Sequence, residues 1–338
     1  MKAKKVIQYS VIVLIAVIGI VAFKFFGPAT TAPADKYFYI KTGSNYNQVS
    51  SALKEQHIIS SSLFFDWLSS WLNYSNAVKP GRYEIPEGMS IFNLVRMLRN
   101  GKQSPVRLVI NKIRTKEDIA GFIGKKFECD STSVINFFNS NDSLKKYNLD
   151  SNTVVTAIIP NTYIYHWNTS FPKLFSRIYY EHNKFWNDKR KTEAAALNLT
   201  PVQVYTLASI VEEETVQESD KPLIASVYLN RMRKGMKLGA DPTVKFALRN
   251  FALKRIYEKY LLYDSPYNTY KYAGLPPGPI CTPSVKTIDA CLQPAQTKYL
   301  YFVASADRPG YHDFAETYEE HLKLAKKYQE KLDSLNIH

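Results

Sequence analysis

The first 26 residues carry the longest apolar run of the chain. Lysines occupy three of the first five positions, and eighteen mostly apolar residues follow from Val6 to Phe23. A helix that spans a bilayer needs about 20 such residues, and a positively charged flank stays in the cytoplasm. The pattern predicts a cytoplasmic tip at 1–5, a membrane anchor at 6–26, and export of everything that follows.

A cleaved signal peptide is the alternative for this segment, because Ala32-Pro33-Ala34 offers small residues of the kind found at cleavage sites. The apolar core is long for a signal peptide, and the tripeptide lies well beyond it, with Lys24, Phe25 and Phe26 between. We therefore expect a single-pass protein of the cytoplasmic membrane whose bulk is extracytoplasmic.

Short periodic segments after a linker at 27–36 predict a small module at 37–105. The linker is rich in Ala, Thr and Pro, as boundary segments often are. Ser90 suits a helix N-cap, and Gly101 suits the end of the same helix. The predicted elements of the module are strands at Tyr37–Ile40 and Gly81–Ile85 and helices at Tyr46–Gln56, Ser62–Leu72 and Ser90–Asn100.

Helical periodicity dominates the larger region at 106–338. Caps such as Thr200 followed by proline mark several helix starts, and few segments have the alternation of a strand. The fold class predicted is α+β, with an N-terminal transmembrane helix, a small module and a larger mixed α/β domain. The expected elements are a strand at Val106–Val109, helices starting near Thr115, Ser131, Phe171, Thr200, Asp220 and Asp241, and a hairpin with arms at Tyr299–Ala304 and from His312.

Three consecutive carboxylates, Glu212, Glu213 and Glu214, end the apolar helical run that contains ASIVEEET. At 3.6 residues per turn, Glu213 points away from the apolar face toward solvent, Glu214 points toward it and Glu212 lies at its border. A carboxyl beside apolar side chains has a raised pKa and can act as a general acid. The alternative is a helix end whose acids are solvated or paired with Lys and Arg.

The chain is basic, with 44 Lys and Arg against 30 Asp and Glu and a formal net charge of +14. These charges are spread along the chain, and an exported protein meets anionic lipid headgroups and cell-wall carboxylates. We expect no nucleic-acid partner. The three cysteines, Cys129, Cys281 and Cys291, form no C-x-x-C pair and have no histidine at zinc-ligand spacing, so we expect no metal and no cofactor. Cys281 and Cys291 fit two free thiols, with a disulfide between them as the alternative.

Several separated blocks of this region resemble the YceG-like endolytic murein transglycosylases. They occur in the family's order and spacing, and the resemblance covers roughly two thirds of the chain. The blocks are PNTY at Pro160–Tyr163, the run from Leu207 to Val244, SPYNTY at Ser265–Tyr270, GLPPGPICTP at Gly274–Pro283 and YLYFVA at Tyr299–Ala304.

The resemblance implies a lytic transglycosylase that cuts the bond between N-acetylmuramic acid and N-acetylglucosamine in nascent peptidoglycan. The 6-hydroxyl of the muramic acid attacks its own anomeric carbon, which leaves a 1,6-anhydro end and limits glycan length. Most glycosidases need two carboxylates, whereas one suffices here. The resemblance assigns the acid/base role to Glu212, with Glu214 as a supporting acid.

Other site residues are also implied by the resemblance. Asn230 and Asp241 would support catalysis, although Asp241 equally suits a helix N-cap. The expected substrate-binding residues are Tyr163, Thr243, Tyr267, Asn268, Tyr270 and His312. The chain departs from the family at Asn161 and Gly239, where Asp and Gln are commoner, and at Val155–Ala157.

The segment KPGRYEIPEGMSIFNLVRML resembles the LysM-like module that precedes the catalytic domain in this family, where it is associated with glycan binding. The implied partners are glycan strands, the cytoplasmic membrane and the peptidoglycan-synthesis and division machinery. Two alternatives stay open: a catalytically silent wall-binding scaffold, and a hydrolytic muramidase in which a second carboxylate activates water.

Overall fold

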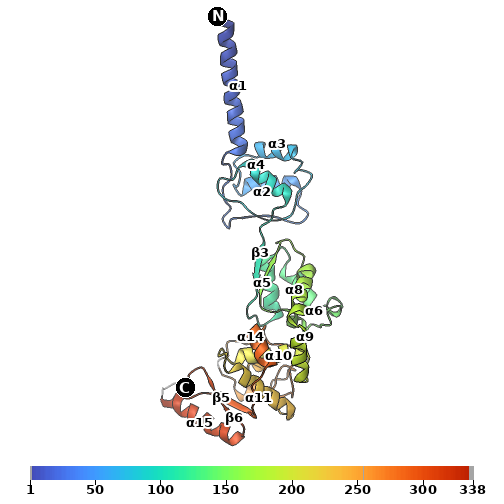
Figure 1. Cartoon of the computed structure of the whole chain (residues 1–338), viewed down its shortest axis with the longest axis vertical. Coiled ribbons are helices and arrows are strands. Elements are labelled where there is room, and N and C mark those ends of the chain that lie inside the picture. The colour runs from blue at the N-terminus through green and yellow to red at the C-terminus, as the bar shows by residue number, and fades with distance from the viewer. Residues whose placement is uncertain (1, 254, 335–338) are drawn as a thin grey trace. The chain divides into compact units, whose positions relative to one another are not determined.

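The computed structural model describes residues 2–253 and 255–334 (Figure 1). The chain divides into two compact units. Unit 1 comprises Met1–Leu108, Lys126–Cys129 and Ile164–Ser170, and unit 2 comprises Val109–Lys125, Asp130–Tyr163 and Phe171–His338. Helices predominate and the strands form two-stranded sheets. The predicted mixed α/β character with an apolar N-terminal helix is confirmed.

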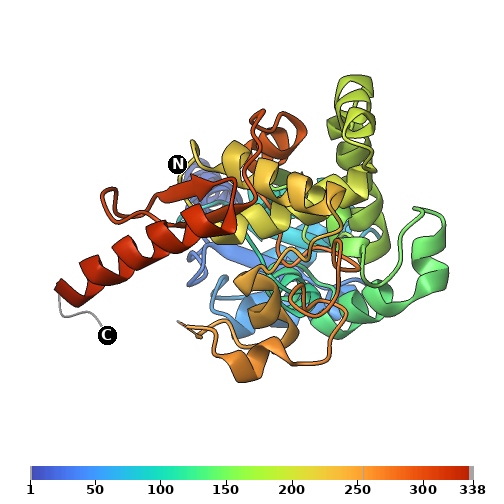
Figure 2. The ribbon, with the colours of Figure 1, turned by 90° about the horizontal axis from the view of Figure 1, so that it is seen from below.

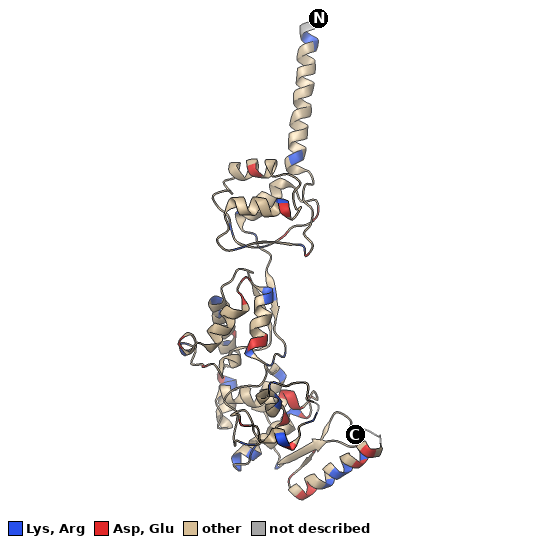
Figure 3. Cartoon of the chain, turned by 180° about the vertical axis from the view of Figure 1, so that it is seen from behind, with Lys and Arg blue, Asp and Glu red and all other residues tan. Residues whose placement is uncertain are grey.

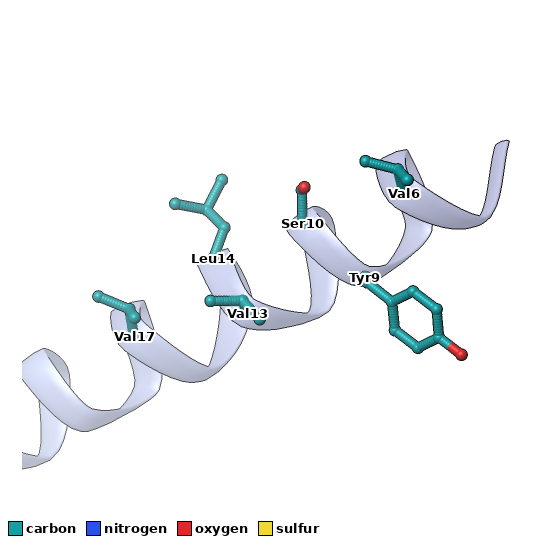
Figure 4. A pocket seen from close by; sticks show the side chains of 6 residues that line it. All are labelled: Val6, Tyr9, Ser10, Val13, Leu14 and Val17. Carbon is teal, nitrogen blue, oxygen red and sulfur yellow. The ribbon is translucent and has the colours of Figure 1, made fainter. Parts of the chain in front are cut away.

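Helix α1 (Lys2–Phe26) begins unit 1, and its segment Lys4–Phe26 is long and apolar enough to cross a membrane. Figure 4 shows a shallow recess along this helix. Because its walls come from one helix, the recess is an open helix flank and not a ligand cavity. It is lined by Val6, Tyr9, Ser10, Val13, Leu14 and Val17.

The small module of unit 1 is built around one antiparallel pair of strands. In this pair Phe38 lies opposite Tyr83, and both are buried. The predicted elements are confirmed with shifts of one residue at some ends: β1 (Tyr37–Ile40), α2 (Tyr46–Glu55), α3 (Leu63–Trp71), β2 (Gly81–Glu84) and α4 (Ile91–Asn100). The Ser90 side chain caps α4, and Gly101 ends it at a φ of 66°, a left-handed conformation that glycine adopts without strain.

The segment expected to be a linker is bonded to this module. The amides of Ala29 and Thr30 donate to the carbonyl of Met89 over 3.2 and 3.1 Å, and Thr30 forms an isolated bridge with Ile59. Phe25, at the end of α1, joins the hydrophobic core of the module. Residues on both sides of this segment are therefore packed against the same core.

The middle of the chain contains short helices and the strand pair β3–β4. The helix predicted to start near Phe171 ends at Phe185, because Asn187 accepts a hydrogen bond from the amide of Arg190 and starts a new helix. The elements are β3 (Val106–Val109), α5 (Lys116–Lys126), α6 (Ser131–Asn139), α7 (Asn141–Lys145), the 3-10 turn η1 (Val154–Ala157), β4 (Thr162–Tyr165), α8 (Phe171–Phe185) and α9 (Asp188–Ala196).

Helix α10 (Pro201–Glu214) is the central helix of unit 2. Every residue from Val204 to Val211 is buried, including Tyr205, Thr206 and Ser209, so the helix is covered on all sides and not on the single predicted face. It packs against α11 (Lys221–Arg233), α12 (Asp241–Ala247) and α14 (Val285–Leu292). The pattern of the sequence did not predict α14.

The C-terminal part of unit 2 is a hairpin of β5 (Tyr301–Ala304) and β6 (His312–Ala315), as predicted, and its register pairs Phe302 with Phe314. Helix α15 (Tyr318–Ser334) lies along the hairpin (Figure 2). It has no buried residue and carries interspersed acidic and basic side chains (Figure 3). The short helix α13 (Glu258–Leu261) comes before the proline-rich segment Gly274–Pro283.

Candidate active site

Helix α10 delivers three glutamates to one end of the core of unit 2. Thr200 and Gln203 form a capping box at its start, Pro201 occupies the first turn, and the helix ends at Glu214. The residues before Glu212 in this helix carry no charge, so all its carboxylates lie at its C-terminus. A helix C-terminus carries partial negative charge and disfavours a further anion, so each carboxylate needs a partner or a proton.

Glu212 is held by a network that joins three helices. Its Oε2 accepts hydrogen bonds from Ser284 Oγ at 3.1 Å and from Thr287 Oγ1, and Lys221 Nζ lies 3.5 Å away. The Lys221 side chain is only 4% exposed and that of Glu212 14%. Ser284 is also the N-cap of α14. This carboxylate therefore connects α10 to the starts of α11 and α14.

Glu213 corrects a prediction, because its side chain does not point to solvent. It is 13% exposed and forms ion pairs with Lys112 at 3.1 Å and Arg114 at 3.0 Å. The arginine contact is bidentate, with Nε and Nη2 each donating to one carboxylate oxygen. Helical projection alone could not place these cations, which come from a segment about a hundred positions earlier in the chain.

The structure changes the protonation of Glu214. Burial, together with the nearby Asp241 carboxylate, raises the pKa of Glu214 to about 7. The Tyr228 hydroxyl donates to Oε1 at 2.6 Å and opposes this rise, as do Lys245 and Arg231. A carboxyl with this pKa exchanges a proton near neutral pH, which general acid/base chemistry requires.

Asp241 and Tyr270 lie beside Glu214. The Tyr270 hydroxyl donates to Asp241 Oδ1 at 2.6 Å, and burial together with this carboxylate raises the pKa of Tyr270. The N-cap interpretation of Asp241 is wrong: Ala240 occupies the cap position and Asp241 is the first residue of α12. The Asp241 side chain therefore accepts the hydrogen bond of Tyr270 and acts electrostatically on Glu214. We call Glu214, Tyr228, Asp241 and Tyr270 the acid cluster.

Gly239 adjoins the acid cluster. Its φ of +59° lies in the left-handed region, and a Cβ there would stand 3.5 Å from both the Tyr270 ring and Arg231 Nη1. This backbone conformation favours glycine, so the departure of this chain from the commoner glutamine fits the geometry.

Thr243 and Asn268, two other predicted site residues, are buried and bond to backbone carbonyls. Thr243 Oγ1 donates to the carbonyl of Ala240 at 2.7 Å and contacts Thr269 Oγ1 at 2.9 Å. The Asn268 amide donates to the carbonyls of Leu261 and Tyr263. They fix the start of α12 and the loop that carries Tyr270.

Asn230 and Tyr163 also make backbone contacts. Asn230 Nδ2 donates to the carbonyls of Thr297 and Tyr299 at 2.9 and 3.0 Å. The hydroxyl of Tyr163, a residue only 5% exposed, donates to the carbonyl of Ile159 at 2.7 Å. Little of the Tyr163 surface is open to a ligand.

His312 is tied to the start of α11, where its backbone amide and Nδ1 lie 2.8 and 3.1 Å from Asp220 Oδ2. Asp220 occupies the N-cap position of α11, as predicted, but its side chain serves His312 and not the helix amides. Tyr267 packs its ring 4.8 Å from that of Phe246. The structure thus brings Asp241 and Tyr270 to Glu214 and gives His312 and Tyr267 other neighbours.

Sequence reasoning missed Tyr228, Lys221, Ser284 and Thr287. Tyr228 lies one helix later than Glu214, and Ser284 is more than 70 positions from Glu212. Ser284 does carry the local signal of an N-cap, but the contact with Glu212 depends on how α14 packs.

Cys281 and Cys291 are buried free thiols, and Cys281 Sγ donates to the carbonyl of Ser209 at 3.3 Å. Within residues 2–253 and 255–334, no group of three or more His, Cys, Asp or Glu side chains is placed to hold a metal ion.

The profile of the YceG-like family matches residues 38–327 of this chain. The chain belongs to the YceG-like family. A relative from Bacillus subtilis (strain 168), named endolytic murein transglycosylase, is 28% identical over 305 residues, which are 86% of this chain and 83% of the relative. A relative of the same name from Streptococcus pneumoniae serotype 2 is 26% identical over 317 residues, 83% of this chain but only 56% of that longer protein.

A solved YceG-like structure supports the fold. The crystal structure of a YceG-like protein from Listeria monocytogenes matches with a TM-score of 0.59 at 28% identity, over 86% of this chain and 99% of that one. The likeness in fold therefore covers most of this chain and nearly all of that one.

Proposed function

We propose that this YceG-like chain is an endolytic murein lytic transglycosylase, which cleaves the bond between N-acetylmuramic acid and N-acetylglucosamine and leaves 1,6-anhydro ends. The observation that carries the proposal is the Glu214 carboxyl, whose pKa is raised to about 7 at the end of a buried helix. The names of the curated relatives from Bacillus and Streptococcus support the same activity.

One carboxyl with this pKa can perform both proton transfers. In the protonated form it gives its proton to the glycosidic oxygen as the bond to the anomeric carbon breaks. As a carboxylate it then takes the proton of the 6-hydroxyl, whose oxygen bonds to that carbon. The proton returns to the carboxyl, no water is consumed, and the enzyme is restored.

The surroundings favour Glu214 over Glu212 for this role. One carboxylate oxygen of Glu212, Oε2, is already engaged by Lys221, Ser284 and Thr287. Glu214 has one hydrogen bond from Tyr228 and an acidic neighbour that favours its protonated form. The resemblance predicts the opposite assignment, with Glu212 as the acid and Glu214 as its support, and the structure does not test it. In the present proposal Glu212 positions the end of α10.

Asp241 and Tyr270 complete the proposal at the site. Asp241 favours the protonated form of Glu214, and Tyr270 orients Asp241 through a 2.6 Å hydrogen bond. Thr243 and Asn268 act by holding the backbone around this cluster, and Asn230 holds the backbone at Thr297 and Tyr299. Direct contacts with sugar from Tyr163, Tyr267 and His312 remain predictions.

We also propose that the enzyme works at the outer face of the cytoplasmic membrane. Helix α1 anchors it in the cytoplasmic membrane and the remainder lies outside, where nascent strands emerge. The LysM-like module at 37–105 binds glycan and the region at 106–338 cuts it, beside the peptidoglycan-synthesis and division machinery. The folded, self-contained core of the module supports its treatment as a separate part.

The deciding experiment compares muropeptides released from isolated murein by the full chain, Glu214→Gln and Glu212→Gln, by mass spectrometry. Glutamine keeps the shape of the side chain but cannot give up a proton. We expect anhydro ends from the parent protein, a loss of at least a hundredfold in rate for Glu214→Gln, and a smaller loss for Glu212→Gln.

Each alternative gives a different result. Activity lost only in Glu212→Gln would return the acid role to that residue. Reducing muramic acid ends would identify a hydrolytic muramidase. No product from any of the three proteins, with murein binding intact, would indicate a wall-binding scaffold.

A further inference from the structure

Helix α3 is apolar on two opposite faces. Phe65 and Leu68 face the core of the module and are almost fully buried. Leu63, Trp67 and Trp71 follow at intervals of four residues, so they share one face, and they are 75%, 59% and 68% exposed. A helix that is hydrophobic all round normally has apolar surroundings on every side.

The outward face of α3 has no charged side chain. The only ionisable residue of this helix, Asp66, accepts hydrogen bonds from the hydroxyls of Tyr46 at 2.5 Å and Ser50 at 2.9 Å. The Trp67 and Trp71 rings lie parallel within 14°, with their centroids 6.2 Å apart. A continuous exposed apolar face of this kind marks an interaction site.

The position of α3 indicates the partner. The ring of Phe25, in the last turn of α1, lies 5.3 Å from that of Phe64 and 5.1 Å from that of Trp67. Phe26 similarly contacts Phe92 of α4 at 5.2 Å. Figures 1 and 3 show α3 at the side of the module where α1 enters it. The tryptophan face thus begins where the apolar helix ends.

We propose that the face formed by Leu63, Trp67 and Trp71 docks on the outer interface of the lipid bilayer that holds α1. Tryptophan is enriched at membrane interfaces because its ring is apolar while its N–H bonds to water or headgroups. An amphipathic helix can lie in that plane with its apolar face among the upper acyl chains. This inference rests on the proposed anchor, and it attaches the module to the membrane through both α1 and α3.

Tryptophan fluorescence tests the docking. The full chain is reconstituted into phosphatidylcholine and phosphatidylglycerol vesicles whose lipids carry bromine near the headgroup end of the acyl chain, a quencher of nearby indoles. We expect at least a twofold reduction of the fluorescence from α3. The double variant Trp67→Phe/Trp71→Phe should lose this quenching, because its remaining tryptophans are Trp167 and the buried Trp186. The matched control Trp167→Phe should keep it.

Flotation with the vesicles after alkaline extraction distinguishes a failure of the membrane anchor from a failure of the α3 docking. A chain that does not float contradicts the anchor itself. A chain that floats while the parent and the double variant are quenched equally overturns the docking of α3. Unquenched α3 tryptophans whose fluorescence instead responds to added glycan strands would also overturn it, and would identify sugar as the ligand of this face.

Discussion

Tyr228 tunes the proposed acid through one hydrogen bond that can be removed with little change of shape. Because this bond lowers the pKa of Glu214, we expect Tyr228→Phe to raise that pKa. The protonated acid is the active form, so kcat/KM falls as pH rises through the pKa of Glu214, near 7. In Tyr228→Phe this fall should move to higher pH.

The pH profile of murein cleavage measures this shift. Tyr205→Phe is the matched control, since that buried hydroxyl bonds to the carbonyl of Ile158 instead and its removal should leave the profile in place. If the fall of kcat/KM in Tyr228→Phe stayed in place or moved to lower pH, the result would contradict the role of the hydrogen bond between Tyr228 and Glu214.

The raised pKa of Glu214 also affects stability. The folded state binds the proton up to a pH of about 7 and the unfolded state only to about 4.5. The stabilisation from protonation is therefore complete below 4.5 and is lost as pH rises through 7. Glu214→Gln is neutral throughout, so at pH 8 we expect it to exceed the parent in free energy of unfolding by on the order of 2 kcal/mol.

Denaturant unfolding at pH 4.5, 6 and 8 should show this difference shrink as pH falls. Glu319→Gln, on the exposed α15, should change stability by less than about 0.5 kcal/mol at every pH. If the gap for Glu214→Gln grew toward acid pH, the sign of the shift would be wrong.

At the scale of elements, α14 holds the end of α10 through Thr287. This buried residue donates to Glu212 and contacts Ser284 Oγ at 2.9 Å. Thr287→Val removes the hydroxyl while keeping the volume, so we expect a loss of about 1–3 kcal/mol in free energy of unfolding. Urea titration measures it. Thr192→Val, on the exposed surface of α9, should cost far less, and equal costs would remove Thr287 from the network.

The sequence predicts those helix starts that carry an N-cap residue, because a cap bonds to backbone amides only a few residues away. Thr200 and Ser90 cap their helices through their own side chains as expected. Asp241 carries the same signal but bonds to Tyr270. The Tyr270 hydroxyl, 29 positions away, binds the carboxylate that would otherwise cap the helix. The sequence around Asp241 does not contain this partner.

At the scale of the whole molecule, the anchor predicts a topology. The lysines at the start of α1 predict a cytoplasmic N-terminus, with the residues after α1 outside. Protease added to cells stripped of their wall should digest the chain beyond α1, and the chain should stay in the membrane pellet after alkaline extraction. A protected chain would reverse the orientation, and release by alkali would exclude the anchor.

The sequence by itself determined the apolar span, most helix and strand positions, the membership of a family and the cluster of glutamates, because periodicity, caps and motifs are local properties of a chain. Only the tertiary structure decided how Glu212, Glu213 and Glu214 differ. Their partners Thr287, Arg114 and Tyr228 come from three other segments. Burial and the nearby charge of Asp241 raise the pKa of Glu214, and these surroundings exist only once the helices have packed.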